Sequence, residues 1–389
     1  MQLKGESMKK IDINSESLQK IQLEKEKCIG CKLCMKGCPM LHEFCESPDN
    51  LLDQLSREKK VDYKLPYSCL LCGYCTVVCP KDVDLKEMFY SLRENIVLET
   101  KGKLPKDLGA TSVKFHQKNS FSRMFSTDII GLGENSDIVF FPGCSIMAYS
   151  PEIVDKTYKY LKDKIPGIGI YLKCCGKPTF SIGYTEEFDH YYGILKAAFK
   201  KNGIKRVVTT CQNCFNTIKN NSSDIEVIPL WEIISEIGVP EEVKGKGKGI
   251  DLVFSIHDPC PTRHESKTHD SIRNILNEIG IGYNEMKFNR ENTLCCGSGG
   301  MVSLTNNTIA LTQKKRRANE SKEEYIVTYC EECVGSMKKG GKKAVHILDL
   351  LFNEDIYNSF NQEEINTMKR WFNRYKGKMK FKNVRKDNI

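Results

Sequence analysis

The chain has 389 residues, of which 40% are hydrophobic and 28% charged, a composition that excludes a disordered or collagen-like chain. Its formal net charge of +9 suits an acidic protein partner, and we expect no nucleic-acid partner. The polar start lacks the apolar region of a signal peptide, and runs such as IVFF at 138–141 are too short to cross a bilayer. We therefore predict a cytoplasmic protein without a membrane span, whose membrane contacts would be made through a partner.

Nineteen cysteines are the strongest signal in the composition. In a cytosolic chain, where thiols stay reduced, so many cysteines indicate metal or redox chemistry rather than disulfides. The odd number also argues against complete internal pairing. We therefore look for metal-ligand spacing along the chain.

A polar N-terminus, residues 1–19, precedes a first repeat within residues 20–100. Residues 28–39 (CIGCKLCMKGCP) and 69–80 (CLLCGYCTVVCP) share the pattern C-x2-C-x2-C-x3-C-P. In bacterial ferredoxins the fourth cysteine of each such run ligates the cluster of the other run. A pair of zinc sites is the alternative, which two complete runs with both prolines disfavour. The pattern predicts two cubane [4Fe–4S] clusters, one on Cys28, Cys31, Cys34 and Cys79 and the other on Cys38, Cys69, Cys72 and Cys75.

Helices are expected on either side of the second run. The segment 47–60 has a Ser or Asp start, and the segment 82–99 is expected to be capped by Asp84. A polar connection over 101–136 then leads into a second, longer repeat.

Each copy of the longer repeat has a single cysteine after an apolar run, then an adjacent pair, then a C-x2-C motif. Strand-like and helix-like patterns alternate in both copies, which predicts parallel sheets. Cysteines at strand ends lie at the usual ligand-binding edge of such a sheet. The two sets are Cys144, Cys174, Cys175, Cys211 and Cys214, and Cys260, Cys295, Cys296, Cys330 and Cys333.

The boundaries of these parts follow from the patterns. We assign a first α/β unit to 137–243 and a second to 250–360. The run KGKGKG at 244–249 predicts a flexible linker, and the basic tail at 361–389 is interpreted as a solvated terminus. The predicted fold class is α/β, with two repeated units behind a small α-helical ferredoxin-type domain.

The adjacent cysteines need a special explanation, because a disulfide between neighbours is strained. Both thiols can reach one metal cluster if the backbone turns tightly. A following glycine, Gly176 or Gly297, removes the Cβ that would block the turn or the cluster. Each copy then offers five thiolates, one more than a cubane cluster or a zinc ion takes.

This pattern resembles the cysteine-rich CCG domain of heterodisulfide reductase catalytic subunits. With the ferredoxin-type runs in front, the chain is similar to the fused form of that enzyme over about residues 20–350. The resemblance implies that each five-cysteine set holds a non-cubane [4Fe–4S] cluster and that a disulfide is cleaved between the two clusters. It makes Cys175 and Cys296 catalytic as cluster ligands. Zinc in one set, with the fifth thiol idle, is the alternative.

A few residues remain outside these sets. Cys45 is interpreted as a buried small residue without a role. His257 is a candidate proton donor because disulfide reduction consumes protons, but the simpler interpretation is one structural histidine followed by two exposed ones, His264 and His269. The run GSGG at 297–300 lacks the lysine of a P-loop and indicates close packing beside a cluster. No nicotinamide or flavin motif is visible, so we expect no flavin in this chain.

Two functions fit these features. In the first, a redox partner (a ferredoxin, a flavoprotein or a membrane cytochrome subunit) delivers electrons to the cubane clusters. The electrons then pass to the non-cubane pair, which reduces a small-thiol disulfide. In the second, the chain is the iron–sulfur electron-transfer subunit of a flavin dehydrogenase complex of the glycerol-3-phosphate, lactate or glycolate type. The complete five-cysteine sets favour the first.

Overall fold

The computed structural model describes residues 10–249, 251–353, 360 and 365–382. The chain divides into two compact units. The first comprises residues 1–113, 178–186 and 297–313, and the second comprises residues 114–177, 187–296 and 314–389. Each unit therefore combines segments that are far apart in the sequence. The predicted domain boundaries do not follow this division and stay a prediction.

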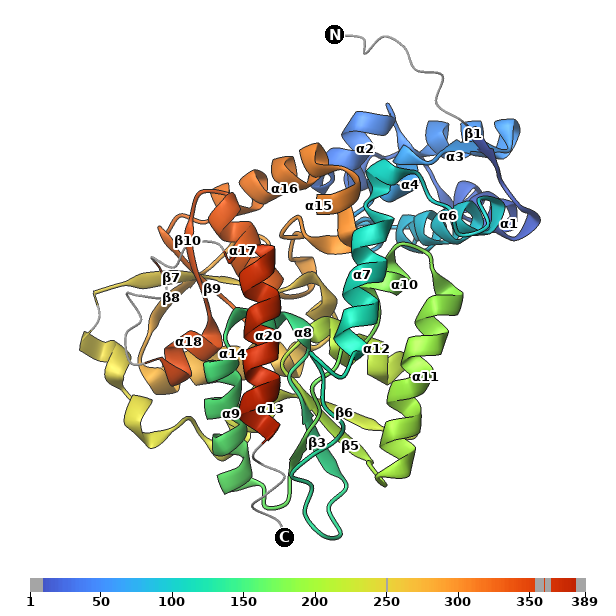
Figure 1. Cartoon of the computed structure of the whole chain (residues 1–389). Helices are drawn as coiled ribbons and strands as arrows, with labels where there is room; N and C mark the ends of the chain where they lie inside the picture. Colours follow the sequence, from blue (N-terminus) through green and yellow to red (C-terminus); the bar gives the residue numbers. More distant parts are fainter. Residues whose placement is uncertain (1–9, 250, 354–359, 361–364, 383–389) are drawn as a thin grey trace. The chain divides into compact units, whose positions relative to one another are not determined.

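The first unit is mostly helical, as expected (Figure 1). The predicted cap of the helix after the second cysteine run is confirmed, since Asp84 accepts a hydrogen bond from the Glu87 N–H at 3.0 Å. Two short antiparallel strands pair Lys10 with Asp62. The elements of this unit are β1 (Lys10–Asp12), α1 (Ser15–Lys27), η1 (Leu33–Gly37), α2 (Pro39–Phe44), α3 (Pro48–Glu58), β2 (Lys60–Asp62), α4 (Lys64–Tyr67), α5 (Tyr74–Val77), α6 (Leu85–Glu99), η2 (Lys106–Leu108), η7 (Gly299–Met301) and α15 (Val302–Thr305). Among the described residues, four helices have residues in both units: α7 (Ala110–Phe121), α10 (Lys177–Ser181), α11 (Thr185–Lys201) and α16 (Asn307–Asn319).

One buried arginine joins the three segments of the first unit. The Arg93 side chain donates hydrogen bonds to the carbonyls of Pro66 and Cys69, at 2.9 and 2.6 Å. It also donates to the carbonyls of Ser181 (2.5 Å) and Gly300 (2.7 Å), which follow the two cysteine pairs in the sequence. A buried guanidinium needs such partners, because its five N–H groups would otherwise be unsatisfied. Gly300 fits there because a Cβ would lie 2.4 Å from the Cys69 carbonyl oxygen, which bears out the close packing expected for GSGG.

The second unit contains two four-stranded parallel sheets of the same topology. Their orders are β4-β3-β5-β6 and β8-β7-β9-β10, so corresponding strands of the two repeats take corresponding places. The predicted α/β class with parallel sheets is confirmed. The first sheet is β3 (Ile138–Phe141), β4 (Gly169–Ile170), β5 (Arg206–Thr209) and β6 (Glu226–Pro229), and the second is β7 (Val253–His257), β8 (Gly282–Glu285), β9 (Tyr325–Thr328) and β10 (Lys343–His346).

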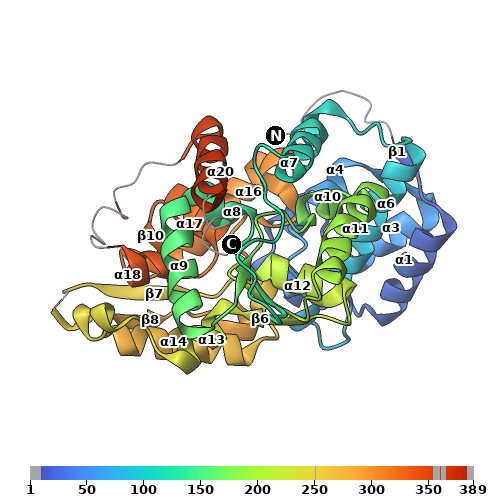
Figure 2. The same ribbon diagram turned by 60° about the horizontal axis from the view of Figure 1, so that its bottom comes forward.

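The helices of the second unit join both repeats into one hydrophobic core. Trp231, on α13, is fully buried against Tyr329 and His346 of the second repeat, with ring centroids 6.0 and 5.7 Å away. Helices α13 and α14 pack together, as Figure 2 shows. The helices are α7 (Ala110–Phe121), α8 (Cys144–Tyr149), α9 (Pro151–Lys164), α11 (Thr185–Lys201), α12 (Gln212–Asn221), α13 (Leu230–Ile237), α14 (Ser266–Ile279), α17 (Glu331–Lys339), α18 (Ile347–Phe352) and α20 (Thr367–Lys382), with short 3-10 turns η3 (Glu241–Val243), η4 (Lys246–Gly249), η5 (Cys260–Thr262) and η6 (Arg290–Asn292).

The interpretation of the basic tail as a solvated terminus is wrong for Thr367–Lys382. These residues form α20, which packs on α8 and α9 (Figure 1). Asn373 donates hydrogen bonds to the carbonyls of Ala148 and Tyr149, and Phe381 is fully buried. Residues 361–364 and 383–389 of the predicted tail lie outside the described residues.

The predicted flexible linker is also more ordered than its composition suggests. Lys246–Gly249 form η4, and the Gly245 N–H donates to the Glu278 carbonyl at 2.9 Å. A Cβ on Gly247 would lie 2.7 Å from the Gly280 backbone, so the glycine that suggested flexibility serves a close contact instead. No helix in the described part of the chain combines the length and the apolarity that a membrane span needs.

Candidate metal centres

The eight cysteines of the ferredoxin-type runs form two groups in the first unit. Cys28, Cys31, Cys34 and Cys79 line one cavity, which Cys75 also borders. Cys38, Cys69, Cys72 and Cys75 form the other group, because the charges of Cys72, Cys69 and Cys38 all act on Cys75. The first group contains the four cysteines of one predicted ligand set together with Cys75 of the other, and the assignment of ligands to clusters stays a prediction.

Charge and burial act strongly on these thiols. Burial raises the pKa of Cys34 and Cys69 to about 11. Burial also raises the pKa of Cys75, and the charges of Cys72, Cys69 and Cys38 raise it further. Thiolates placed together in this way need a cation to stabilise them, and metal ligation supplies one.

The first CCG set is built at the ends of three neighbouring strands. Cys144 begins α8 just after β3, the pair Cys174 and Cys175 follows β4, and Cys211 is the N-cap of α12 after β5. Cys214 lies in the first turn of α12, where the helix dipole favours a thiolate. A hydrogen bond from Cys174 lowers the pKa of Cys144 well below its usual range.

Cys175 lies at the centre of this set. Hydrogen bonds from Cys174 and Cys214 hold its pKa well below the usual value, whereas the same two bonds raise the pKa of those partners. The predicted role of Gly176 is refined by its surroundings. It has φ +88°, and a Cβ there would lie 2.9 Å from the Phe188 ring. The backbone turn and the packing against Phe188 both require glycine, and Gly297 has a similar φ of +95°.

A histidine that sequence reasoning missed belongs to the first set. His116 lies on α7, and its Nε2 is 3.7 Å from Cys174 Sγ, with Cys144 in the same group. Helix α20 supports it, because Trp371 packs on His116 and the Arg374 guanidinium lies 4.4 Å from the Trp371 ring. His116 falls in a stretch taken as a polar connection and α20 in one taken as a solvated tail, so no motif or spacing pointed to either.

The second CCG set repeats the pattern with one difference. Cys296 is held by hydrogen bonds from Cys295 and Cys333, which lower its pKa well below the usual range, and His257 adds to this effect. Cys330 is the N-cap of α17. Cys260 begins the short turn η5 and, among the described residues, is not part of this thiol contact group.

The two CCG sets are close enough to influence each other. The pKa of Cys330 is raised: its hydrogen bond with Cys333 lowers it, but burial and the charges of Cys211 and Cys296 outweigh that bond. Cys211 belongs to the first set and Cys330 to the second. Because the charge of Cys211 acts on Cys330, these edges of the two candidate centres lie near each other within the second unit.

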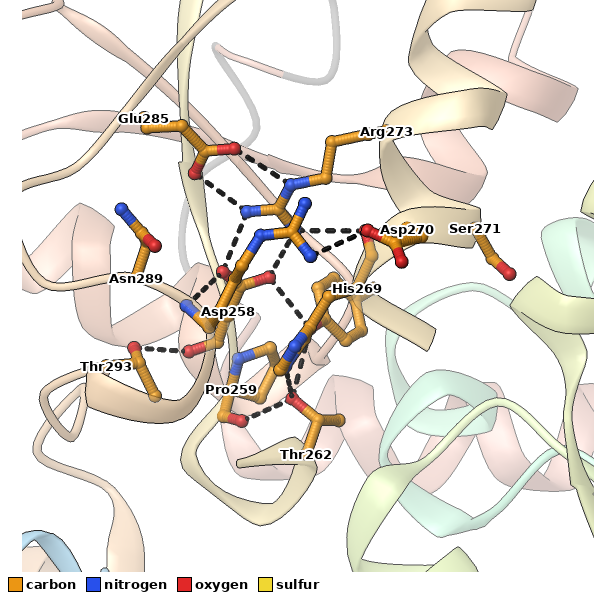
Figure 3. Close-up of polar contacts among 12 residues, drawn as sticks. Asp258, Pro259, Thr262, His269, Asp270, Ser271, Arg273, Glu285, Asn289 and Thr293 are labelled. Carbon is orange, nitrogen blue, oxygen red and sulfur yellow. Dashed lines mark hydrogen bonds and ion pairs between the residues drawn. The ribbon is translucent and has the colours of Figure 1, made fainter. Parts of the chain in front are cut away.

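A buried carboxylate connects the segments that carry the second set, as Figure 3 shows. Asp258 lies two residues before Cys260 and binds Arg273 through both oxygens, at 2.6 and 2.8 Å. The Tyr329 hydroxyl donates to Asp258 at 2.9 Å, and Thr293 donates to its carbonyl at 2.7 Å. Because Thr293 and Tyr329 directly precede the other two cysteine segments, one residue fixes all three.

The histidines near Cys260 and the leftover Cys45 differ in burial. His257 is fully buried, and burial lowers its pKa. His264 is exposed, as predicted, but His269 is buried, contrary to prediction, because α14 turns it toward the Thr262 hydroxyl at 3.2 Å. Cys45 is half-buried, and its thiol donates to the Leu41 carbonyl at 3.2 Å.

The donors fit thiolate-ligated metal. Among the described residues, each CCG contact group contains thiols and one imidazole, and no cysteine is disulfide-bonded. Such soft donors suit iron–sulfur clusters or zinc, whereas magnesium and calcium prefer oxygen ligands.

Family comparisons agree with this chemistry. Residues 24–83 match the 4Fe-4S dicluster domain, and residues 138–219 and 254–338 match the cysteine-rich domain named CCG. These matches confirm the ferredoxin-type module and both CCG repeats.

The relatives are distant but cover most of the chain. An uncharacterised iron–sulfur protein of Methanococcus maripaludis is 26% identical over 79% of this chain, which spans 66% of that relative's length. A dihydromethanophenazine:CoB–CoM heterodisulfide reductase subunit of Methanosarcina barkeri is 22% identical, covering 84% of this chain and 92% of the relative. The glycolate oxidase iron–sulfur subunit of Escherichia coli is 24% identical, with 87% and 83% covered.

One solved structure has a comparable fold. A hypothetical protein from Helicobacter pylori, 10% identical, matches with a TM-score of 0.51 over 90% of this chain and 74% of that chain. At this identity the likeness concerns the fold alone.

Proposed function

Because this chain is an iron–sulfur oxidoreductase of the heterodisulfide reductase type, with a dicluster domain and two CCG domains, we propose that it reduces a small disulfide to two thiols. The reaction balances as R–S–S–R′ + 2 e⁻ + 2 H⁺ → RSH + R′SH. Electrons enter through the dicluster domain, and the two CCG sets form the reducing centre.

One observation carries this proposal. The charge of Cys211, from the first repeat, raises the pKa of Cys330, from the second, so the two thiol groups lie near each other within a single compact unit. A disulfide has two sulfur atoms to release, and two neighbouring centres provide one place for each. A chain that only relayed electrons would need no such symmetric pair.

The residues that would hold the clusters follow from their contacts. Cys144, Cys174, Cys175, Cys211 and Cys214 would hold one cluster, and Cys295, Cys296, Cys330 and Cys333 would hold the other. Cys260 is assigned as the fifth ligand of the second cluster from its place in the sequence repeat. Iron–sulfur clusters bound here would supply single electrons and iron atoms with an affinity for sulfur. We assign both as non-cubane [4Fe–4S] clusters; zinc in one set is the competing assignment.

The chain's own residues prepare these sites. Cys211 and Cys330 are the N-caps of α12 and α17, so each C-x2-C motif is held at the start of a helix. Low pKa values keep Cys175 and Cys296 as thiolates at the centre of each set. Burial of these cysteines excludes water from the neighbourhood of the reacting sulfurs.

We infer that the protein works with a redox partner, because the relatives named above include a subunit of a heterodisulfide reductase and a subunit of glycolate oxidase. A ferredoxin, a flavoprotein or a membrane cytochrome subunit could each deliver the electrons. We propose that the protein is cytoplasmic and contacts a membrane through that partner. The alternative is an electron-transfer subunit beside a flavin dehydrogenase, which the similarity to the glycolate oxidase iron–sulfur subunit favours.

The test uses reduced viologen as donor and a panel of small symmetric and mixed disulfides. Wild-type protein with loaded clusters should reduce at least one, and Cys175→Ser or Cys296→Ser should each abolish turnover. The double variant should be no worse than either single one, since groups that act as a unit are not additive. Cys45→Ser is the matched control and should keep full activity.

The opposite result is equally clear. If fully loaded protein reduces no disulfide but accepts electrons from a flavin dehydrogenase, the electron-transfer alternative replaces the reductase.

A further inference from the structure

The second CCG set contains a histidine whose two ring nitrogens have very different surroundings. His257 ends β7 and is fully buried. One of its ring nitrogens and the sulfurs of Cys296 and Cys333 all lie within 4.8 Å of one another. The question is whether this imidazole binds the metal or donates a hydrogen to the sulfurs.

Arg317 answers it from the other side of the ring. Its Nε donates a hydrogen bond to His257 Nδ1 at 3.1 Å. A guanidinium has five N–H donors and no acceptor, and it keeps its proton in proteins. His257 Nδ1 must therefore present a lone pair, and the hydrogen of the neutral ring must be on Nε2.

The arginine is well fixed in this position. Arg317 is fully buried on α16. Its Nη1 donates to Glu320 at 2.5 Å, and its Nη2 donates to the Phe288 carbonyl at 2.9 Å. With both terminal nitrogens held, Nε cannot turn away from the histidine.

The remaining ring nitrogen has an unmet need. His257 Nε2 is buried and, among the described residues, has no nitrogen or oxygen acceptor. A buried N–H without an acceptor is costly. Since Nδ1 is occupied by Arg317, Nε2 is the nitrogen left for the Cys296 and Cys333 sulfurs.

We propose that Arg317 is a positioning residue that fixes His257 as an Nε2–H donor toward the sulfurs of the second CCG set, and that His257 is not a metal ligand. This assignment rests on the proposed iron–sulfur function of that set. A metal-binding histidine usually donates its second ring N–H to a carboxylate or carbonyl. Here the second nitrogen meets a donor instead, which is the opposite arrangement.

Among the described residues, the first set has no counterpart of the Arg317–His257 hydrogen bond, and the sequence repeat explains why. His257 occupies the place of Phe141 at the end of the corresponding strand β3. In the first set the imidazole comes from His116 on a different helix. The two sets therefore share their thiols and differ in their hydrogen-bond donors, which would give them different reduction potentials.

The first test reads the tautomer directly. Full-length protein as purified, labelled with 15N at histidine, should show His257 protonated at Nε2 in long-range 15N–1H spectra, with the signal assigned through its loss in His257→Gln. Arg317→Met should allow the Nδ1–H form to appear. Protonation of His257 at Nδ1 in the wild type would overturn the proposal. This readout does not depend on any disulfide turnover, so it fails or succeeds separately from the proposed function.

The second test measures the midpoint potential of the second-set cluster. An N–H donor stabilises the more negative, reduced form, so His257→Leu should lower the potential. We expect at least a tenfold change in the reduction equilibrium, which is about 59 mV for one electron. Arg317→Met should shift it the same way, whereas His257→Gln, which keeps an N–H donor, and His264→Gln, on the exposed side, should not.

A strong nitrogen coupling from His257 in pulsed EPR spectra of the reduced cluster would also overturn the proposal, because it would show direct ligation. If Arg317→Met fails to fold, the pair His257→Leu and His257→Gln still decides the question. Equal potentials for these two variants would contradict a donor role.

Discussion

A single carboxylate residue, Asp258, contacts residues beside the cysteine segments of the second set, and Figure 3 shows its contacts with Arg273 and Thr293. Burial raises the pKa of Asp258, but the hydrogen bonds and charge of Arg273 outweigh burial and bring it to about 2. We predict that Asp258→Asn destabilises the protein by about 3 kcal/mol, because removing one partner of a buried pair leaves the other charge uncompensated. The loss is measured as the shift in chemical denaturation, together with iron bound per chain.

The matched control for this variant is Asp270→Asn. Asp270 also pairs with an arginine, Arg290 at 2.7 Å, but its side chain is 62% exposed. An exposed pair contributes little, so its loss should change stability by less than about 1 kcal/mol. Equal effects of the two substitutions would mean that Asp258 has no special role.

At the residue scale, the sequence predicted the candidate cysteine ligands but not the residues that contact them, such as His116 and Arg317. Cysteine spacing places ligands because a run such as C-x2-C closes on one metal regardless of the rest of the fold. His116, by contrast, reaches Cys174 only through the placement of α7. Arg317 reaches His257 across 60 residues of chain, and no spacing rule connects them.

At the scale of elements, the helix α18 has a pH-sensitive start. His346 is its N-cap, and Nδ1 accepts a hydrogen bond from the Leu348 N–H at 3.2 Å. Burial lowers the pKa of His346 to about 3, whereas the unfolded chain binds this proton near its usual value of 6.5. Stability is therefore complete above pH 6.5 and is lost as the pH falls toward 3, by about 1.4 kcal/mol per pH unit.

His346→Asn should remove this loss. Asparagine is a good N-cap and does not titrate, so the variant should show a weaker dependence of stability on pH between 6.5 and 4.5 than the wild type. Chemical denaturation at several pH values measures the slope. His190→Asn, at an exposed position on α11, should keep the wild-type slope. If His346→Asn keeps it too, other groups cause the acid sensitivity.

Elements were predictable where local pattern decides them. The amphipathic segment 185–203, with its glycine stop, contains α11 (Thr185–Lys201), and the strand-like runs before Cys211 and Cys330 form β5 and β9. Helix α20 was not predictable, because its sequence is rich in lysine and does not indicate the tertiary contacts that stabilise it. A Cβ on Gly377 would lie 2.2 Å from Met147 Sδ, so the helix depends on a close tertiary approach.

At the scale of the molecule, three distant segments share one compact unit. Arg93 contacts Ser181 and Gly300, which are 88 and 207 residues away in the sequence. Composition and repeats predict domains that follow one another along the chain. The buried hydrogen bonds of Arg93 instead join three segments that are distant in the sequence. The loops that follow both cysteine pairs therefore depend on the dicluster segment for their hydrogen-bond partners.

The last prediction concerns the whole chain and its metal. Eighteen of the nineteen cysteines belong to the four proposed ligand sets, and Cys45 is held apart by its bond to Leu41. Four [4Fe–4S] clusters require about sixteen iron atoms and as many sulfides per chain. Anaerobic purification with iron, sulfide and zinc analysis measures this. Cys296→Ser should remove about four irons and leave the EPR signals of the dicluster domain unchanged, because serine is a much poorer ligand for iron. Iron for two clusters only, accompanied by stoichiometric zinc, would contradict the non-cubane assignment and leave the dicluster domain as the sole electron carrier.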